Sequence, residues 1–239
     1  MKHFYSVHTS TTAGRDLFNG PALLSHDVTL DKEGEGPQIL IYHTHSQEAF
    51  KDSGPQGRTI VEVGDYLAEL LTQKGYRVYH DTSVYDLQSG VLDRSKAYNY
   101  ALEGVNRILQ QNPSIQVVLD LHRDGVSENL HMVSDINGKP TAQIMFFNGL
   151  SRTPEGKIAY LSNPYLAENL AFSLKMQLGA QAYFPGFARK IYLKGLRYNL
   201  HLRPKSALIE AGAQTNTFEE VKNAMEPLAQ LLDMVLQGE

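Results

Sequence analysis

The fold is decided by residues 38–48, which read Gln38-Ile39-Leu40-Ile41-Tyr42-His43-Thr44-His45-Ser46-Gln47-Glu48. The first half of this stretch is a short apolar run, too brief for a helix and rich in β-branched residues, which predicts a buried strand. The strand ends in two histidines and a carboxylate. Because ligands bind beyond the carboxyl ends of strands in open α/β sheets, we expect this strand end to belong to a functional site.

His45 and Glu48 have the spacing H-x-x-E. Side chains three positions apart in a turn or a first helical turn can point the same way, and imidazole and carboxylate both suit Zn²⁺. The pattern is common, so the rest of the chain must supply a further ligand and a base before it indicates a metal site.

Composition limits the classes of function. A chain of 239 residues with 42% hydrophobic and 20% charged residues is typical of a soluble globular protein. The net charge of −4 argues against a general nucleic-acid binder. The chain contains no cysteine, which excludes disulfides, thiolate zinc sites and a cysteine nucleophile. Any metal must therefore be held by His, Asp and Glu.

The sequence shows neither an apolar run of about 18 residues nor an N-terminal apolar segment of the kind found in signal peptides. At face value this predicts a cytoplasmic protein. A soluble piece of a longer chain without its natural N-terminus fits equally well, and the lack of cysteine suits an oxidising, extracytoplasmic place.

Residues 1–37 are polar and rich in turn signals. We expect an N-terminal arm that packs on the main domain through Phe18, Leu23 and Leu24. Residues 38–239 are predicted to form one α/β domain, because strands alternate with helices and no long linker divides them. The expected architecture is a single three-layer sandwich, with a mostly parallel central sheet flanked by helices.

The expected elements follow from apolar spacing and from turn and cap signals. An Asn137-Gly138 turn predicts a hairpin between residues 131–135 and 143–148. Ser162-Asn163-Pro164 is expected to cap a helix, and Thr217 with Glu220 to form a capping box. Strands are predicted at 76–80, 115–121 and 207–212, with 188–193 a further candidate, and helices at 60–74, 93–111, 162–182 and 217–236.

Three predicted strands stop in ionisable residues: His43-Thr44-His45 after Tyr42, His122 after Leu121, and Glu210 after Ile209. Parallel strands would bring all three ends to one edge of the sheet. There His45, Glu48 and His122 could hold a zinc ion with a fourth position open, the pattern of a hydrolytic zinc. Glu210 would be the general base. Histidines that only cap or hydrogen-bond the strand ends are the alternative.

Other residues near these strand ends have open assignments. His43 should point away from His45 and either supports a ligand or is spare. Asp120 should accept the second N–H of a ligand histidine. Glu62, at the start of a helix, is an alternative ligand to Glu48. Arg123 and Asp124 either form a local ion pair that shapes the loop or bind substrate.

The loop of residues 194–201 carries Arg197, which could bind a substrate carboxylate with two hydrogen bonds or could be an ordinary surface residue. Phosphate-loop and dinucleotide glycine patterns are missing from the sequence, and so is G-x-S-x-G. These absences argue against nucleotide enzymes and serine hydrolases.

The motifs together resemble the stage II sporulation protein P family. They are residues 39–48, the run Asp120-Leu121-His122-Arg123-Asp124, Arg197-Tyr198-Asn199 and Ile209-Glu210-Ala211-Gly212. The resemblance runs over most of the chain. It implies a fold similar to zinc-dependent N-acetylmuramoyl-L-alanine amidases, which cut the amide between muramic acid and the stem peptide. An endopeptidase activity on cross-links is also attributed to this family.

The resemblance also implies roles for single residues. His45 and His122 correspond to metal ligands and Glu210 to the catalytic glutamate. Glu48 is our third ligand, since H-x-x-E is also similar to the pattern of zinc carboxypeptidases, while Glu62 stays open because related amidases take this ligand from farther along. Arg197 and Asn199 are assigned to substrate binding, and His43, Asp120 and Asp124 to support of the site.

Members of this family are normally membrane-anchored and act outside the cytoplasm, in the septal wall during spore engulfment. The implied partners are peptidoglycan, the lytic transglycosylase stage II sporulation protein D, and stage II sporulation protein M, with no nucleic acid. This chain would then be a soluble fragment without the anchor. Two rivals remain: a zinc carboxypeptidase or aminoacylase acting on free peptides, and a non-catalytic wall-binding domain.

Overall fold

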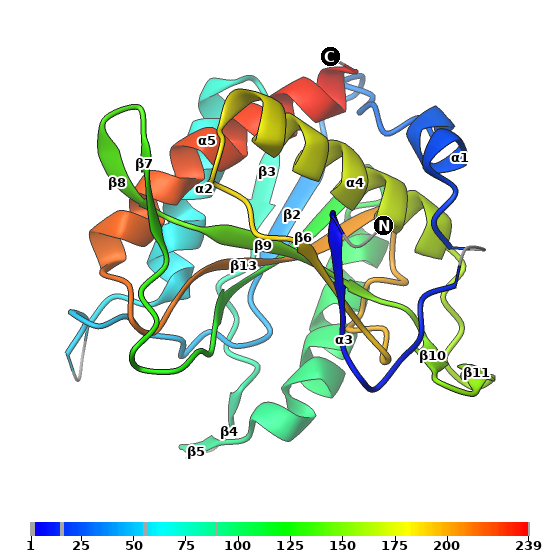
Figure 1. The fold of residues 1–239 in the computed structure, drawn as a ribbon, viewed down its shortest axis with the longest axis horizontal. Coiled ribbons are helices and arrows are strands. Elements are labelled where there is room, and N and C mark those ends of the chain that lie inside the picture. The colour runs from blue at the N-terminus through cyan, green and yellow to red at the C-terminus, as the bar shows by residue number, and fades with distance from the viewer. Residues whose placement is uncertain (1–2, 15–16, 55–56, 89, 239) are drawn as a thin grey trace.

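The computed structural model describes residues 3–14, 17–54, 57–88 and 90–238 (Figure 1). Among them, a seven-stranded sheet has the order β1-β12-β9-β13-β6-β2-β3. Its strands, in that order, are Tyr5–Val7, Ile191–Lys194, Ile144–Gly149, Lys205–Ala213, Val117–Asp124, Ile39–Tyr42 and Val78–His80. The short strands are β4 (Leu87–Gln88) with β5 (Val91–Leu92), β7 (Val133–Ile136) with β8 (Lys139–Ala142), and β10 (Arg152–Thr153) with β11 (Gly156–Lys157).

Strand pairing in the large sheet is parallel except between β9 and β13, which are antiparallel. The predicted mostly parallel sheet between helices is confirmed. The single antiparallel pair reverses the sheet, so β9, β12 and β1 run opposite to β13, β6, β2 and β3. One edge of the sheet therefore carries the carboxyl ends of β2, β6 and β13 beside the beginnings of β9 and β12.

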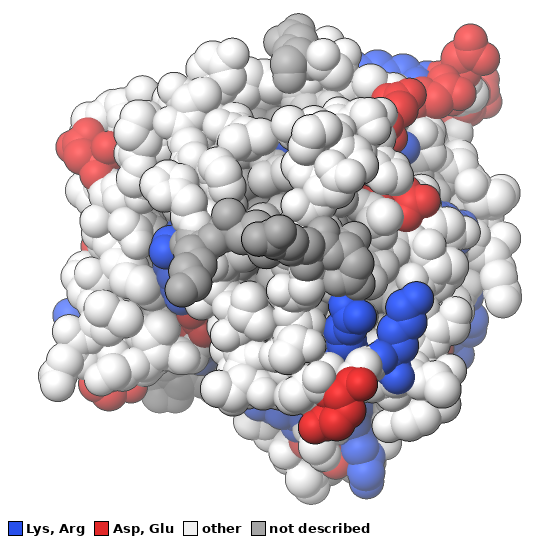
Figure 2. All heavy atoms as spheres, turned by 45° about the vertical axis from the view of Figure 1, so that its right-hand side comes forward, with Lys and Arg blue, Asp and Glu red and all other residues white. Residues whose placement is uncertain are grey.

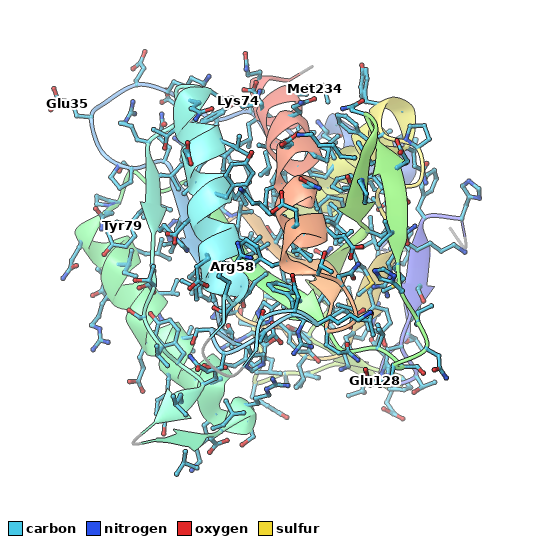
Figure 3. The ribbon with its side chains drawn as sticks, turned by 90° about the vertical axis from the view of Figure 1, so that its left-hand side faces the viewer. Glu35, Arg58, Lys74, Tyr79, Glu128 and Met234 are labelled. Carbon is cyan, nitrogen blue, oxygen red and sulfur yellow. The ribbon has the colours of Figure 1, made fainter. Side chains whose placement is uncertain are left out.

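Helices cover the two faces of the sheet unequally. Helices α2 (Ile60–Gln73), α4 (Leu166–Tyr183) and α5 (Phe218–Gln237) pack on one face, and Figure 3 shows α2 and α5 side by side on the outside of the molecule. On the other face, α3 (Arg94–Gln111) packs against β2 and β6. Over β9 and β13 this second face carries a small cluster of Phe147, Leu208 and the loop residue Leu200.

Local sequence signals explain the helix ends. The predicted capping box of α5 is present, with Thr217 and Glu220 each bonding the other's backbone N–H. The predicted cap of α4 was wrong: the helix begins at Leu166 and has no side-chain cap. Asn163, one of the expected cap residues, instead donates its amide to the carbonyl of Gly149.

The N-terminal residues do more than the sequence predicted, because β1 joins the edge of the large sheet beside β12. The short helix α1 (Gly20–Ser25) packs on α4. Leu23 is 5% exposed and Phe18 packs against the Tyr5 ring, but Leu24 is 46% exposed, so its expected packing role was wrong. The domain boundary at residue 37 stays a prediction.

The Asn137-Gly138 turn is confirmed, with both residues at positive φ between β7 and β8. The returning strand is β8 rather than residues 143–148, of which residues 144–148 belong to β9 in the large sheet. The apolar run of β9 is buried along its whole length. A strand inside the large sheet can bury both of its faces, whereas a strand of an exposed hairpin cannot. No helix in the described part of the chain is long and apolar enough to cross a membrane.

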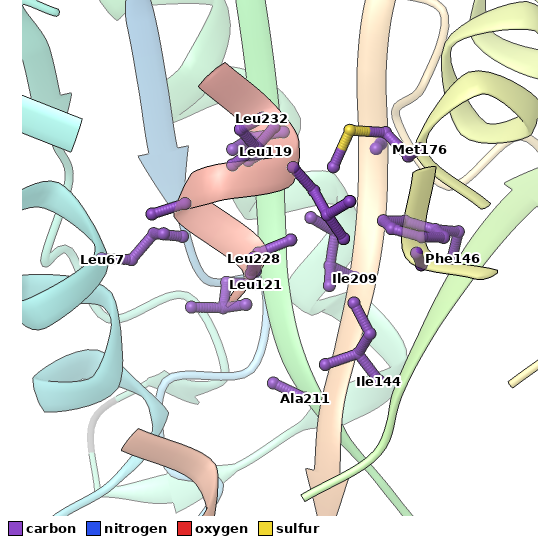
Figure 4. Close-up of a cluster of buried hydrophobic side chains, with 14 of the residues drawn as sticks. Leu67, Leu119, Leu121, Ile144, Phe146, Met176, Ile209, Ala211, Leu228 and Leu232 are labelled. Carbon is purple, nitrogen blue, oxygen red and sulfur yellow. The ribbon is translucent and has the colours of Figure 1, made fainter. Parts of the chain in front are cut away.

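The main core lies between the sheet and the three-helix face (Figure 4). Leu119 and Leu121 of β6 and Ile209 of β13 point into it, and Leu228 and Leu232 of α5 pack over them. These side chains are fully buried, so the strands that carry His122 and Glu210 are fixed from behind by apolar packing.

We predict that Ile209→Ala lowers the free energy of unfolding by about 2–5 kcal/mol, because a fully buried side chain is lost and leaves a cavity. Urea denaturation of the metal-free protein measures this. The matched control is Val91→Ala, whose side chain is 66% exposed and should change stability little. Equal effects of the two substitutions would contradict the assignment of Ile209 to the core.

Candidate functional site

The ends of β2, β6 and β13 meet at one edge of the sheet. In the strand register Tyr42 lies opposite Asp120, and His122 lies opposite Glu210. The loop after β2 brings His45 to the same place, with its ring centroid 5.2 Å from that of His122. The structure therefore brings together the histidines and the glutamate that the sequence placed at separate strand ends.

Two buried carboxylates hold the loop after β2. Asp120 accepts hydrogen bonds from the backbone N–H of Thr44 at 2.9 Å and from its hydroxyl at 2.6 Å. Asp86 accepts from the Ser46 hydroxyl at 2.9 Å and from the N–H of Gln47 at 3.2 Å. Because both carboxylates are buried, these contacts fix the backbone on either side of His45.

The ring of His122 lies between two carboxylates. Its Nε2 is 2.8 Å from Oδ1 of Asp120, and its Nδ1 is 3.7 Å from Oε2 of Glu48. The same Glu48 oxygen accepts from the N–H of Arg123 at 2.8 Å. Asp120 thus lies where it was expected, on one nitrogen of a candidate ligand, and Nδ1 of His122 faces Glu48.

Three buried atoms at this edge have no hydrogen bond of good geometry among the described residues, namely Nδ1 of His45, Nε2 of His122 and Oε2 of Glu210. Buried polar atoms are normally satisfied, so such atoms indicate where a ligand binds. Two imidazoles and Glu48 suit zinc by their chemistry. In the described residues, however, no three His, Asp or Glu side chains are already grouped as a metal centre. Metal binding would need these side chains to move together.

The two histidines have opposite proton affinities. Burial, with the neighbouring His122 adding to it, lowers the pKa of His45 to about 4. Burial would also lower the pKa of His122, but Asp120, Glu48 and Glu210 outweigh it and raise the value to about 10. Without metal at neutral pH, His45 is therefore neutral and His122 protonated. Metal binding to His122 must release that proton.

Glu210 is a carboxyl group that titrates near neutral pH. Burial raises its pKa to about 8; the nearby His122 opposes this rise, and Glu48, Asp124 and Asp120 add to it. A group with a pKa close to the working pH is suited to both taking up and releasing a proton.

Glu62 and His43 lie elsewhere. Glu62 is exposed, and its Oε2 accepts from the N–H of Thr59 at 2.7 Å in the capping box of α2. His43 is buried, with Nδ1 2.8 Å from the carbonyl oxygen of Leu121 and Nε2 2.8 Å from Nε2 of His80. Of the two candidate third ligands, Glu48 and Glu62, it is Glu48 whose side chain lies next to His122.

Asp124 forms its ion pair with Arg189, at 2.7 Å. The local pair with Arg123 that we considered is not the contact found. The Arg123 side chain donates instead to backbone carbonyls, those of Ala49 at 2.8 Å and of Asp124 at 3.1 Å. Arg123 therefore ties the loop that carries Glu48 to the end of β6.

The loop after β12 places Arg197 and Asn199 in other contacts. Arg197 donates from Nη1 to the carbonyl of Ser162 at 3.0 Å. Asn199 is 6% exposed and donates to the carbonyl of Tyr98 at 2.8 Å, which holds this loop against α3. Their role in substrate binding stays a prediction.

Tyr98 of α3 is a site residue that we missed. Its ring centroid lies 5.5 Å from that of His45 and 6.3 Å from that of His122, against which it stacks. Burial first, and then Asp120 and Glu210, raise its pKa well above the usual range, so the hydroxyl remains a hydrogen-bond donor. In the sequence, the only indication that Tyr98 faces the rest of the protein was its position directly after Ala97, a residue of the apolar stripe of α3.

A hollow of about 580 Å³ adjoins the site on the Glu210 side. It is lined in part by Met145, which pairs with Glu210 in the strand register, and by Asp124, Arg189 and Tyr192. This hollow is where a substrate could extend beyond the three strand ends.

A larger hollow of about 650 Å³ lies between α1, the β10–β11 hairpin and the start of α4. None of the predicted site residues lines it. Figure 2 brings this side of the molecule forward and shows Lys and Arg in small groups beside Asp and Glu, not in one basic field.

Comparison with known proteins gave one family. The sequence profile of the family described as Stage II sporulation protein P (SpoIIP) matches residues 7–233. Stage II sporulation protein P of Bacillus subtilis (strain 168) is 23% identical over 215 residues, which cover 82% of this chain and 50% of that protein. The chain thus spans about half the length of this curated relative.

Solved structures with a similar fold include the CwlD amidase from Clostridioides difficile in complex with the GerS lipoprotein. It has a TM-score of 0.51 and 14% identity, covering 84% of this chain and 96% of that one. N-acetylmuramoyl-L-alanine amidase AmiC2 of Nostoc punctiforme has a TM-score of 0.46 and 15% identity, covering 85% and 97%. The first of these comparisons shows that the chain has an amidase-like fold.

We predict that, relative to Glu210→Gln, the metal-free wild type loses stability as the pH rises from about 5 to about 8. The folded pKa of Glu210, about 8, lies above its ordinary value of 4.5, so the unfolded chain releases this proton first and its stabilising effect is lost as the pH rises. His122, raised from 6.5 to about 10, acts in the same direction at higher pH. Glu210→Gln cannot titrate at this position, while His43 and His45, whose lowered pKa values act in the opposite direction, contribute to both proteins alike.

Urea denaturation in the presence of a chelator, repeated across this pH range, measures the effect. Equal pH slopes for the wild type and Glu210→Gln would mean that Glu210 has an ordinary pKa.

Proposed function

Because the chain belongs to the stage II sporulation protein P family, we propose that it is a zinc-dependent peptidoglycan hydrolase, first an amidase between N-acetylmuramic acid and the stem peptide. Hydrolysis of peptide cross-links would be its second activity. The observation that carries the proposal is the convergence of His45, His122 and Glu210 at one sheet edge, where buried atoms of His45 and Glu210 lack partners.

His45, His122 and Glu48 are the residues that would hold zinc. Zinc bound there would act as a Lewis acid on the scissile carbonyl. Asp120 lies 2.8 Å from Nε2 of His122 as an ion-pair partner, so Nδ1, on the Glu48 side, is the nitrogen that would bind the metal. The hydrogen bonds of Asp120 and Asp86 to the loop keep His45 in place.

Glu210 would move the proton. From its place beside His122, it would take a proton from the attacking water and pass it to the leaving amine. The hydroxyl of Tyr98 remains protonated and is available as a donor to a substrate oxygen. Both side chains belong to this chain, so the proton transfers need no partner protein.

A polymeric substrate is favoured over a free peptide. The second sheet face is covered by α3 on one side only, and the hollow of about 580 Å³ is lined by Asp124 and by Met145, the register partner of Glu210. A carboxypeptidase would need a closed pocket that ends in a carboxylate clamp, and Arg197 is bound to the Ser162 carbonyl instead. A glycan strand could pass through such an open site with its peptides attached.

The family suggests where this activity is used. We propose action outside the cytoplasm during spore engulfment, with stage II sporulation protein D trimming the glycan and stage II sporulation protein M as a membrane partner. The chain spans about half of its curated relative, so these assignments concern the whole protein and are proposals for this part of it.

The proposal predicts the products of a peptidoglycan digest. The wild type with added Zn²⁺ should release free stem peptides and leave denuded glycan, as resolved by mass spectrometry. A chelated sample and Glu210→Gln should release neither, because the first lacks metal and the second lacks the proton-transfer group. If Glu210→Gln still bound peptidoglycan and cleaved it at the wild-type rate, Glu210 would not be the base.

The same digest tests the binding-domain rival. If the wild type binds the polymer but releases nothing even with zinc and a glycan-trimming enzyme present, the result supports a non-catalytic wall-binding domain. Split cross-links without free stem peptides would make the protein an endopeptidase first.

We further predict that Glu48→Gln weakens zinc binding by more than about 100-fold, because the loss of a direct ligand should exceed the 10–100-fold effect of losing an outer partner. Glu62→Gln is the matched control and should keep wild-type affinity, since Glu62 caps a helix. Calorimetric titration with Zn²⁺ measures both variants without reference to activity. The reverse result would make Glu62 the third ligand.

A further inference from the structure

The start of α3 forms one rim of the candidate site. Arg94 is the first residue of α3, and Tyr98 follows it by four positions, which places both side chains on one face of the helix. The ring of Tyr98 packs against His45 and His122, with centroid distances of 5.5 and 6.3 Å. Arg94 therefore lies one helical turn beyond the residue that touches both histidines, and it is exposed.

The other arginines near the site are already engaged. Arg123 bonds two backbone carbonyls, Arg189 pairs with Asp124, and Arg197 bonds the Ser162 carbonyl. The Arg94 guanidinium has neither a hydrogen bond nor an ion pair within the described ranges. It is thus the arginine at this rim that is free to bind a ligand.

The charge of Arg94 nevertheless reaches the site. Burial and His122 dominate the lowered pKa of His45, and Arg94 lowers it further. At Glu48, burial raises the pKa, and Arg94 is among the groups that oppose this rise. These effects agree with the position of Arg94 at the mouth of the site.

The Arg94 charge differs from the other charges near the site in having no partner among the described residues. Asp124 is paired with Arg189 and Asp120 with His122, so these carboxylates are balanced within the site. An arginine binds a carboxylate with two charge-assisted hydrogen bonds and holds its charge at any relevant pH. A free arginine beside several carboxylates therefore favours acidic substrates that approach from the α3 side.

We propose that Arg94 binds a carboxylate of the stem peptide, the one on the second residue after the scissile amide; this rests on the proposed hydrolase function. Four helical residues advance about 6 Å along α3, and an extended peptide advances about 3.3–3.6 Å per residue. A carboxylate two residues from the bond cleaved beside His45 and His122 thus falls within reach of Arg94. The stem peptide then lies toward α3, and the glycan toward the hollow beside Glu210.

The test uses two synthetic N-acetylmuramoyl peptides that differ only at the second residue, which is a glutamate with a free carboxylate or its amide. The wild type should cleave the acid with a kcat/KM about tenfold higher than the amide, mainly through KM, as expected for one exposed charge-assisted contact. Arg94→Ala should lower the acid to the level of the amide and leave the amide unchanged. Arg94→Lys should recover part of the preference.

The matched control is Arg107→Ala, an exposed arginine farther along the same helix, which should behave as wild type on both substrates. Equal losses on acid and amide in Arg94→Ala, or no loss on either, would overturn the proposal. A preference that follows amidation of the C-terminal carboxylate instead would overturn the assignment to the second residue.

Binding separates this inference from the hydrolase proposal. Calorimetric titration of Glu210→Gln, with and without Arg94→Ala, measures the affinity for both muropeptides without any cleavage. An acid preference that disappears with Arg94→Ala supports the role of Arg94 even if the wild type proves inactive. Equal affinities for acid and amide refute that role even if the hydrolase is confirmed.

Discussion

The buried carboxylate of Asp120 is the group on which the candidate site depends. Burial would raise its pKa, but His122 and the hydrogen bonds from Thr44 outweigh burial and keep the carboxylate ionised. A buried charge is tolerated only when it is paired and hydrogen-bonded, and Asp120 achieves this by joining β6 to the loop after β2. Asp120 thus adds side-chain hydrogen bonds to the β2–β6 pairing that already brings the two histidine-bearing segments together.

Local sequence signals predicted the fold well where a few neighbouring residues decide the structure. The buried strands at β2, β6 and β13 and the capping box of α5 belong to this class. The strand β1 was missed because three residues carry little pattern and their pairing with β12 spans most of the chain. The start of α4 was misplaced because Asn163 bonds a distant strand instead of the helix end.

For the site, strand direction was the informative feature. The proximity of His122 and Glu210 could be predicted from the sequence, because parallel strands end at the same edge of a sheet. Spacing could not choose between Glu48 and Glu62, since both follow β2 closely and only the packed loop shows which one faces His122. Tyr98 and Arg94 escaped notice because α3 folds back over strand ends far away in the sequence.

The antiparallel pair of β9 and β13 has an electrostatic consequence. Because the sheet reverses there, α2, α3 and α5 all begin at the site edge, whereas α4 ends there before β12. Helix beginnings carry about half a positive charge and helix ends about half a negative one. A negatively charged group at this edge is therefore stabilised near the three helix beginnings and destabilised near the end of α4. Because physiological salt screens charges over about 8 Å, this preference acts on groups that lie against the helix ends.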